Sequence, residues 1–136
     1  MATWLLKTEP TTYSFDDLAR ERVTAWTGVK NPTAQANLRA MERGDEVVVY
    51  HSGAKEAVGL GQVARAAYPD PGGDGKLVCV DVAAGKRLAS PVSLATLRES
   101  APFRGSPLLT QGRLSVVPLN AAQVQALQAL ARAGAK

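Results

Sequence analysis

The chain has 136 residues, of which 46% are hydrophobic and 21% are charged, and its formal net charge is +4. This length and composition are typical of one globular domain spanning 1–136, and they exclude intrinsically disordered and solenoid proteins. Segment 1–10 lacks the features of a signal peptide, and no later segment has the roughly 18 uninterrupted apolar residues of a membrane span.

The first predicted elements are a short strand and a short helix. Residues 3–7 alternate between two faces, as in a half-buried strand, and Pro10 ends this strand. Ser14 is a suitable N-cap for a helix through Arg20, because its hydroxyl can accept from free amides at the helix start. Residues 26–30 contain Thr, Gly and Lys beside a tryptophan and are interpreted as a loop.

A second helix and two apolar strands follow. Asn31 precedes a proline and predicts the start of a helix, which Gly44 ends. Residues 46–51 are rich in β-branched side chains and predict a buried strand. The next apolar stretch, 58–67, contains Gly59 and Gly61, which indicate a bulge or a close backbone approach.

The second half of the chain predicts a hairpin, a short helix and a last strand. Residues 68–75 consist of turn-forming residue types, and 77–82 form a strand that can pair with the preceding one. Ser93 can cap a helix of one or two turns. Residues 113–117 predict the last strand, which Pro118 is expected to stop.

The C-terminal helix has the strongest start signal. Asn120 is the expected N-cap, Gln123 stands at the third helical position, and Leu119 can pack on Val124 as a hydrophobic staple. No linker separates two domains, so the strands are expected to share one sheet with the helices around its ends. The expected fold is therefore an α+β, mostly antiparallel barrel.

The chain has few residues suited to catalysis or metal binding. His51 is the single histidine, and its neighbour Ser52 would point to the opposite face of a strand. Cys79 is the single cysteine, so no internal disulfide is possible, and a cytoplasmic location is expected. A zinc site would have to rely on carboxylates, and no pair has the spacing of a known metal motif. Segment 59–61 lacks the third glycine of a dinucleotide loop. No cofactor, no metal and no enzymatic activity are therefore expected.

Two residues allow both a structural and a functional interpretation. Trp26 stands outside any apolar run, so it is either an aromatic at the edge of the core or the wall of a slot on which a base stacks. Asn31 either serves only as a helix cap or also presents its side-chain amide to the edge of a base. The scattered basic residues are compatible with a polyanionic partner but do not require one.

Five segments, in this order and with this spacing, carry a family resemblance: Lys7–Pro10, Trp26–Asn31, Gly44–Ser52, Tyr68–Asp70 and Arg113–Val116. Together they resemble the EVE domain family over nearly the whole chain. The resemblance implies a PUA-like fold, a curled β-barrel flanked by short helices, related to domains that bind RNA and to the YTH and SRA readers. It also implies a non-catalytic reader that accepts a flipped-out modified base, such as a 5-substituted cytosine, from DNA or RNA.

The same resemblance assigns roles to residues at the matching positions. Trp26 would stack on the base, Asn31 or Ser52 would bind its edge, and Lys7 and Lys30 would contact phosphates. Lys30 stands where the family usually has arginine, which would weaken a bidentate phosphate contact. The expected base pocket consists of Trp26, Val29, Asn31, His51, Ser52, Leu114 and Ser115, and its rim or phosphate contacts are Lys7, Thr8, Glu9 and Lys30.

Two other functions remain open from the sequence. One is a small hydrolase of modified nucleotides that uses Glu9 or an aspartate near the pocket. The other is a module that binds a metabolite or a protein partner, for which the apolar stripe of the last helix is not diagnostic. A non-catalytic reader of modified DNA or RNA is the leading hypothesis.

Overall fold

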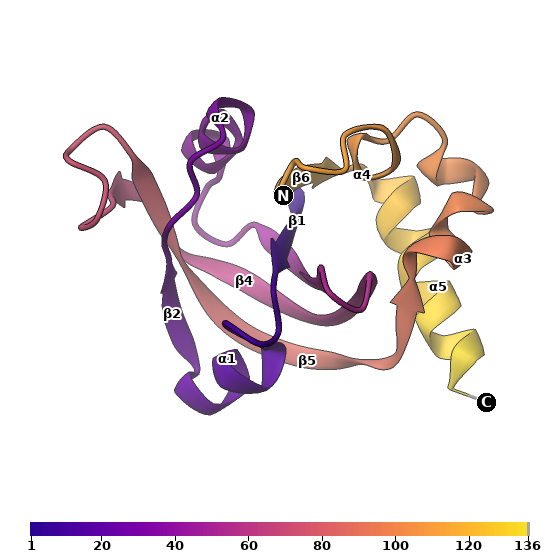
Figure 1. The fold of residues 1–136 in the computed structure, drawn as a ribbon. Helices are drawn as coiled ribbons and strands as arrows, with labels where there is room; N and C mark the ends of the chain where they lie inside the picture. The colour runs from indigo at the N-terminus through magenta and orange to yellow at the C-terminus, as the bar shows by residue number, and fades with distance from the viewer. Residues whose placement is uncertain (136) are drawn as a thin grey trace.

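One six-stranded sheet organises the computed structural model, which describes residues 1–135 (Figure 1). The strands are β1 (Thr3–Thr8), β2 (Val23–Trp26), β3 (Glu46–His51), β4 (Glu56–Pro69), β5 (Val78–Ser93) and β6 (Val116–Leu119). The helices are α1 (Phe15–Glu21), α2 (Pro32–Ala40), α3 (Leu94–Arg98), α4 (Pro107–Thr110) and α5 (Ala121–Gly134), with a 3₁₀ turn η1 at Ala101–Phe103.

The sheet is curled but open. Its strand order is β2-β5-β4-β3-β1-β6, so β2 and β6 are the two edges and do not pair with each other. The expected closed barrel is therefore not what the structure contains. The pairs are mostly antiparallel, as expected, but β1 and β3 run parallel, with Leu5 opposite Val48. Strands β1 and β3 are buried on both faces, which is typical of parallel pairs.

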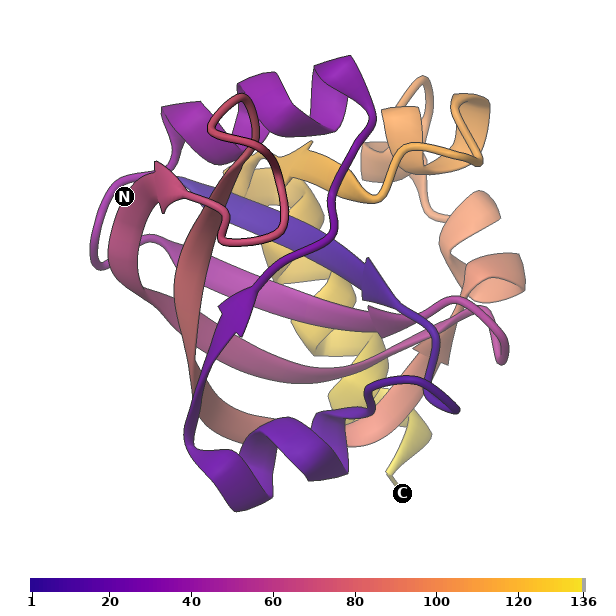
Figure 2. The same ribbon diagram turned by 60° about the vertical axis from the view of Figure 1, so that its left-hand side comes forward.

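Irregular pairing of β4 with β5 accompanies the curl of the sheet (Figure 2). Register shifts occur on both sides of Gly59, and bulges of this kind bend strands and increase their twist. The ring of Phe15 lies where a side chain at Gly59 would be, since an added Cβ would be 2.2 Å from it. The predicted irregularity is thus confirmed, as a bulge at Gly59 and as a close backbone approach at Gly61, where an added Cβ would be 2.6 Å from the Ala83 carbonyl oxygen.

Helices cover the ends and the back of the curled sheet. Figure 2 shows α1 and α2 at opposite ends of the strands, and α5 lies behind them. Helix α5 packs against β5, where Leu127 is fully buried and Ser90 donates to the Ala131 carbonyl at 2.8 Å. No helix in the described residues is long and apolar enough to cross a bilayer.

The predicted helix caps are confirmed. The side chains of Ser14, Asn31 and Asn120 accept from backbone amides three residues ahead, at 3.1, 3.0 and 2.8 Å. Gln123 completes the capping box of α5 by accepting from the Asn120 amide at 2.9 Å. Local side-chain chemistry therefore determines where these three helices begin.

Several strand predictions were wrong at their boundaries. The last strand begins at Val116 and contains Pro118, which lies opposite Trp4. Proline, which has no backbone N–H, is tolerated there because β6 is an edge strand and its outer edge pairs with no other strand. Trp26 is the last residue of β2 rather than a loop residue, and β5 continues to Ser93, through polar positions that do not read as a buried strand.

Candidate functional site

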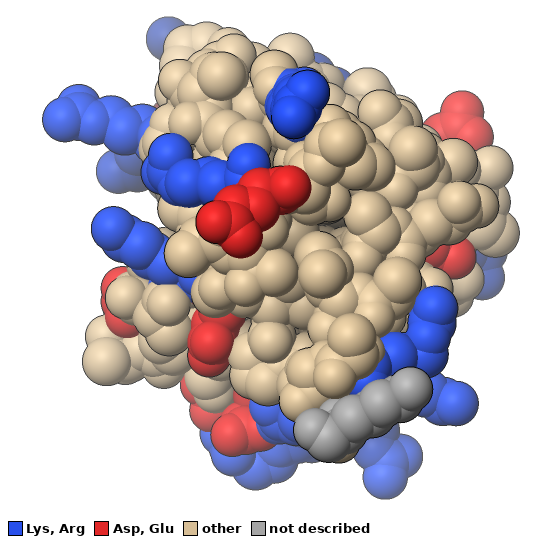
Figure 3. All heavy atoms as spheres, turned by 90° about the vertical axis from the view of Figure 1, so that its right-hand side faces the viewer, with Lys and Arg blue, Asp and Glu red and all other residues tan. Residues whose placement is uncertain are grey.

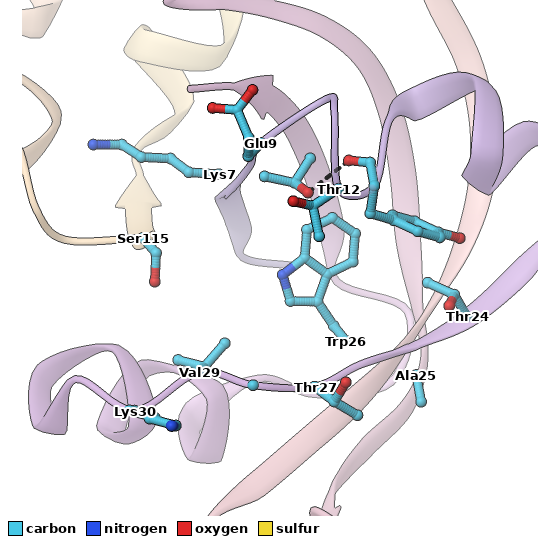
Figure 4. A pocket seen from close by; sticks show the side chains of 13 residues that line it. Lys7, Glu9, Thr12, Thr24, Ala25, Trp26, Thr27, Val29, Lys30 and Ser115 are labelled. Atoms are coloured by element: carbon cyan, nitrogen blue, oxygen red, sulfur yellow. Dashed lines mark hydrogen bonds between the residues drawn. The ribbon is translucent and has the colours of Figure 1, made fainter. Parts of the chain in front are cut away.

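A cavity of about 520 Å³ lies at the opening between the two edges of the sheet (Figure 4). One side is formed by residues 24–30, from β2 and the segment after it, and the other by residues 7–9, at and just after the end of β1, and by Ser115. Residues 12–13 complete it. We call this the Trp26 cavity; its volume is within the range of small-molecule sites.

Trp26 forms the aromatic wall of the cavity. The residue is 8% exposed, and the Tyr13 ring lies edge-on to it at 6.1 Å with an angle of 87° between the planes. Figure 4 shows its indole projecting into the cavity, with the ring nitrogen on the side of Ser115. The Tyr13 hydroxyl donates to the Glu21 carboxylate at 2.6 Å. These contacts fix the plane of the indole before any ligand arrives.

The segment after Trp26 is held from behind by two buried polar side chains. The Gly28 amide donates to the Asp70 carboxylate at 3.0 Å, and Gly28 has a φ of +79°, which favours glycine. The Gln35 amide donates to the Val29 carbonyl at 2.6 Å, while its oxygen accepts from the Val78 amide at 2.9 Å. Asp70 and Gln35 thus connect this wall to the β4–β5 loop and to β5.

The opposite wall carries charged side chains. The Lys7 ammonium donates to the Gly112 carbonyl at 3.0 Å, and burial lowers the pKa of Lys7 below its ordinary value. Figure 4 shows the Lys7 side chain extending away from Trp26. The Thr8 hydroxyl donates to the Tyr13 carbonyl at 2.7 Å, and Ser52 lies 3.5 Å from the Glu9 carboxylate. The cavity therefore has an acceptor at Glu9 and donors nearby.

The structure brings most of the sequence-predicted site residues together. Seven of them line the Trp26 cavity: Lys7, Thr8, Glu9, Trp26, Val29, Lys30 and Ser115. Thr12, Tyr13 and Thr24 also line it but were not foreseen. No local pattern marks these three residues, since their position depends on how α1 and β2 pack.

Four predicted site residues lie outside the lining of this cavity. The Asn31 oxygen caps α2, and Leu114 is 4% exposed in the core. His51 Nε2 accepts from the Phe15 amide at 3.0 Å, and burial lowers the pKa of His51. Ser52 lines a neighbouring hollow. In residues 1–135, no three His, Cys, Asp or Glu side chains gather as a metal site would require.

Comparison with known proteins identifies relatives over most of the chain. The family model described as EVE domain matches residues 2–130. Human thymocyte nuclear protein 1 is 32% identical over 152 aligned residues, which cover 85% of this chain and 68% of that protein. The NMR structure of Rpa0253 from Rhodopseudomonas palustris has a TM-score of 0.91 and 39% identity, covering 98% of this chain and 94% of that one.

A further similar structure contains a ligand. The crystal structure of the human THYN1 protein in complex with 5-methylcytosine-containing DNA has a TM-score of 0.89 and 29% identity. The match covers 96% of this chain and 98% of that chain.

Proposed function

Because this chain belongs to the EVE domain family, we propose that it binds nucleic acid carrying a modified base and holds that base in the Trp26 cavity. The observation that carries the proposal is the similarity to the human THYN1 protein, whose structure was solved with 5-methylcytosine-containing DNA. The matched family and structures indicate a binding module and point to no class of catalysts.

The chemistry of the walls supports a cytosine that carries a substituent at carbon 5. Glu9 offers a carboxylate, which suits the exocyclic amino group of cytosine, and Ser115 offers a hydroxyl. Val29 is an apolar neighbour for the substituent. Trp26 offers an aromatic surface, and base stacking on such a side chain contributes about 1–3 kcal/mol. This contribution offsets the few kcal/mol that extrusion of a base from a duplex costs.

The preference for a methylated base is expected to be modest. Burial of one methyl group stabilises a complex by about 0.8 kcal/mol, which corresponds to about a fourfold change in affinity. A larger preference would require that the unmodified base leave a polar group unpaired. Selectivity should therefore be measured as a ratio of affinities in one buffer, because phosphate contacts make each affinity depend on salt.

The proposal is tested by titrating labelled single- and double-stranded DNA and RNA that carry cytosine or 5-methylcytosine. We expect the methylated strand to bind more tightly, and Trp26→Ala to lose about 5- to 150-fold of the affinity through lost stacking. Val23→Ala is the matched control, because Val23 lies on the same strand and is 49% exposed. Equal binding of methylated and unmodified strands by the wild type would contradict the proposal.

Glu9 connects this test to the hydrolase alternative. Glu9→Gln keeps an acceptor oxygen but removes the charge, so a base-binding role predicts a partial loss of affinity. Incubation of 5-methylcytosine nucleosides and nucleotides with the wild type, followed by mass spectrometry, should return them intact. Turnover that Glu9→Gln abolishes would favour an enzyme instead.

A further inference from the structure

A second, smaller cavity of about 240 Å³ adjoins the Trp26 cavity. Lys7 lines both of them, so the two hollows are neighbours across this side chain. Lys55, from the β3–β4 loop, and Arg98, at the end of α3, also line the smaller hollow, together with Ser52. We call it the basic cavity, defined by Lys7, Ser52, Lys55 and Arg98.

We propose that the basic cavity binds a phosphate group, namely that of the nucleotide whose base occupies the Trp26 cavity. This inference rests on the proposed function for its ligand but on separate residues for its site. In a nucleotide only the sugar stands between base and phosphate, so the two groups require adjoining sites of different chemistry. A cavity with an aromatic wall and a carboxylate, beside a cluster of cations, provides these two sites.

The charges of the basic cavity are available to an anion. Its lining contains three cationic residues and no acidic one. In the described chain the side-chain ion pairs are Arg20 with Asp17 and Arg87 with Asp16, so none involves the basic cavity. The Lys7 ammonium has three N–H donors and uses one of them in its hydrogen bond to the Gly112 carbonyl, so two donors remain for an anion. Glu9 lines the Trp26 cavity and not this one, and its carboxylate accepts from the Ser52 hydroxyl at 3.5 Å, at the boundary between the two cavities.

The surroundings strengthen the attraction between these cations and an anion. Leucine side chains line the same hollow, namely Leu94, Leu108 and Leu109. They reduce the local dielectric, so each charge interacts more strongly than it would in open water. Burial also lowers the pKa of Lys7, because the charged ammonium loses part of its hydration. A bound phosphate would compensate for that lost hydration.

The loop that carries Lys55 is held in place without a ligand. The Ser52 amide donates to the Thr8 carbonyl at 2.9 Å, and the Leu94 amide donates to the Lys55 carbonyl at 2.8 Å. These bonds connect the loop to β1 and to the start of α3. Lys55 has a φ of +54°, a conformation that costs energy for a residue other than glycine and that is frequent at ligand sites. The loop is thus preorganised around the hollow.

The face of the molecule over α3 and α5 is not uniformly basic. Figure 3 shows this face, where a large area carries no charged side chain and Lys and Arg lie in separate groups near its margins, some of them beside acidic side chains. An anionic strand would therefore find few competing contacts on the broad part of this face. A general coating of positive charge would give no reason to assign a phosphate to one hollow.

The test measures binding of 5-methyl-dCMP and of the corresponding nucleoside to the full chain by NMR titration. We expect the nucleotide to bind about tenfold more tightly, and this advantage to disappear in Lys55→Gln and in Arg98→Gln. The preference for the methylated base should persist in both variants. Lys86→Gln and Arg43→Gln remove the same charges at exposed positions outside both cavities and should retain the advantage.

A titration with inorganic phosphate tests the site independently of the base. We expect amide shifts at 52–55 and 94–98 in the wild type and their loss in Lys55→Gln/Arg98→Gln. Equal affinity for nucleoside and nucleotide, or an advantage that survives both substitutions, would overturn the assignment while leaving the proposed function intact. If neither cytosine ligand binds, the proposed function fails, and the absence of shifts with inorganic phosphate would overturn the basic cavity as well.

Discussion

Asp70 is predicted to be the residue through which the β4–β5 loop stabilises the Trp26 cavity. Asp70 is only 5% exposed. Its carboxylate accepts hydrogen bonds from the Gly28 amide at 3.0 Å and from the Gly72 amide at 2.8 Å. In Asp70→Asn one oxygen becomes an amino group, so one of these amides loses its acceptor. The amino group introduced at this buried side-chain position would face an N–H donor, and a buried donor without a partner costs about 1–3 kcal/mol, of which we take about 2 kcal/mol.

This cost converts to a shift in melting temperature. For 136 residues, an unfolding entropy of about 2.1 cal/mol/K per residue gives about 290 cal/mol/K, so 2 kcal/mol lowers Tm by about 7 °C. The assay is thermal unfolding followed by circular dichroism, together with titration of a methylated oligonucleotide. Binding should weaken as well, because Gly28 belongs to the wall that Asp70 holds.

The control for this experiment is Asp74→Asn. Asp74 lies in the same loop, is exposed and undergoes the same change of charge, so it should leave Tm and affinity close to those of the wild type. If the two variants melt at the same temperature, the hydrogen bonds of Asp70 do not support this wall, and the reasoning is refuted.

Three further predictions concern stability and pH. Gly59→Ala should cost about 1–3 kcal/mol because its Cβ would meet Phe15, whereas Gly112→Ala, which has open space, should melt like the wild type. Burial lowers the pKa of His51, so the wild type should lose stability as pH falls below about 6.5, and His51→Gln should not show this loss in urea unfolding. Burial alone would raise the pKa of Asp45, but the N–H groups that donate to its carboxylate outweigh burial and lower the pKa. The wild type should therefore lose stability as the pH falls below about 4. Asp45→Asn should be less stable at pH 7 and should show a smaller loss of stability in that acidic range.

Local sequence chemistry was sufficient to place the starts of α1, α2 and α5, whereas α4, capped by Ser106, was not predicted. Ser14, Asn31 and Asn120 are polar residues that satisfy amides within their own turn, so their effect is independent of the rest of the fold. The same holds for Gly59, whose missing side chain signalled an irregularity in β4. Phe15, whose ring occupies the space beside Gly59, could not be predicted there, because it lies 44 positions earlier and arrives through tertiary packing.

The cavity depended on contacts between distant segments. Trp26 and Glu9 were placed at the site through family resemblance, whereas Tyr13 has no neighbouring pattern that indicates its edge-on contact with Trp26. Asp70 lies in one of the matched segments, yet its role in holding Gly28 is visible only in three dimensions. Gln35 is polar and its sequence position predicts an exposed helix residue, but it is only 3% exposed. Its amide nitrogen donates to two backbone carbonyls from separate segments, those of Val29 and Val78.

The pairing of β1 with β6 sets the order in which the binding site is assembled. Thr3 lies opposite Leu119, and Lys7 donates to the Gly112 carbonyl across 105 positions of sequence. During synthesis on the ribosome, the segment carrying Trp26 is therefore made long before the opposite wall can form. If the Trp26 cavity holds a base as proposed, a nascent chain cannot bind it until β6 has emerged and docked, so ligand binding would report a completed fold and would not guide its first steps.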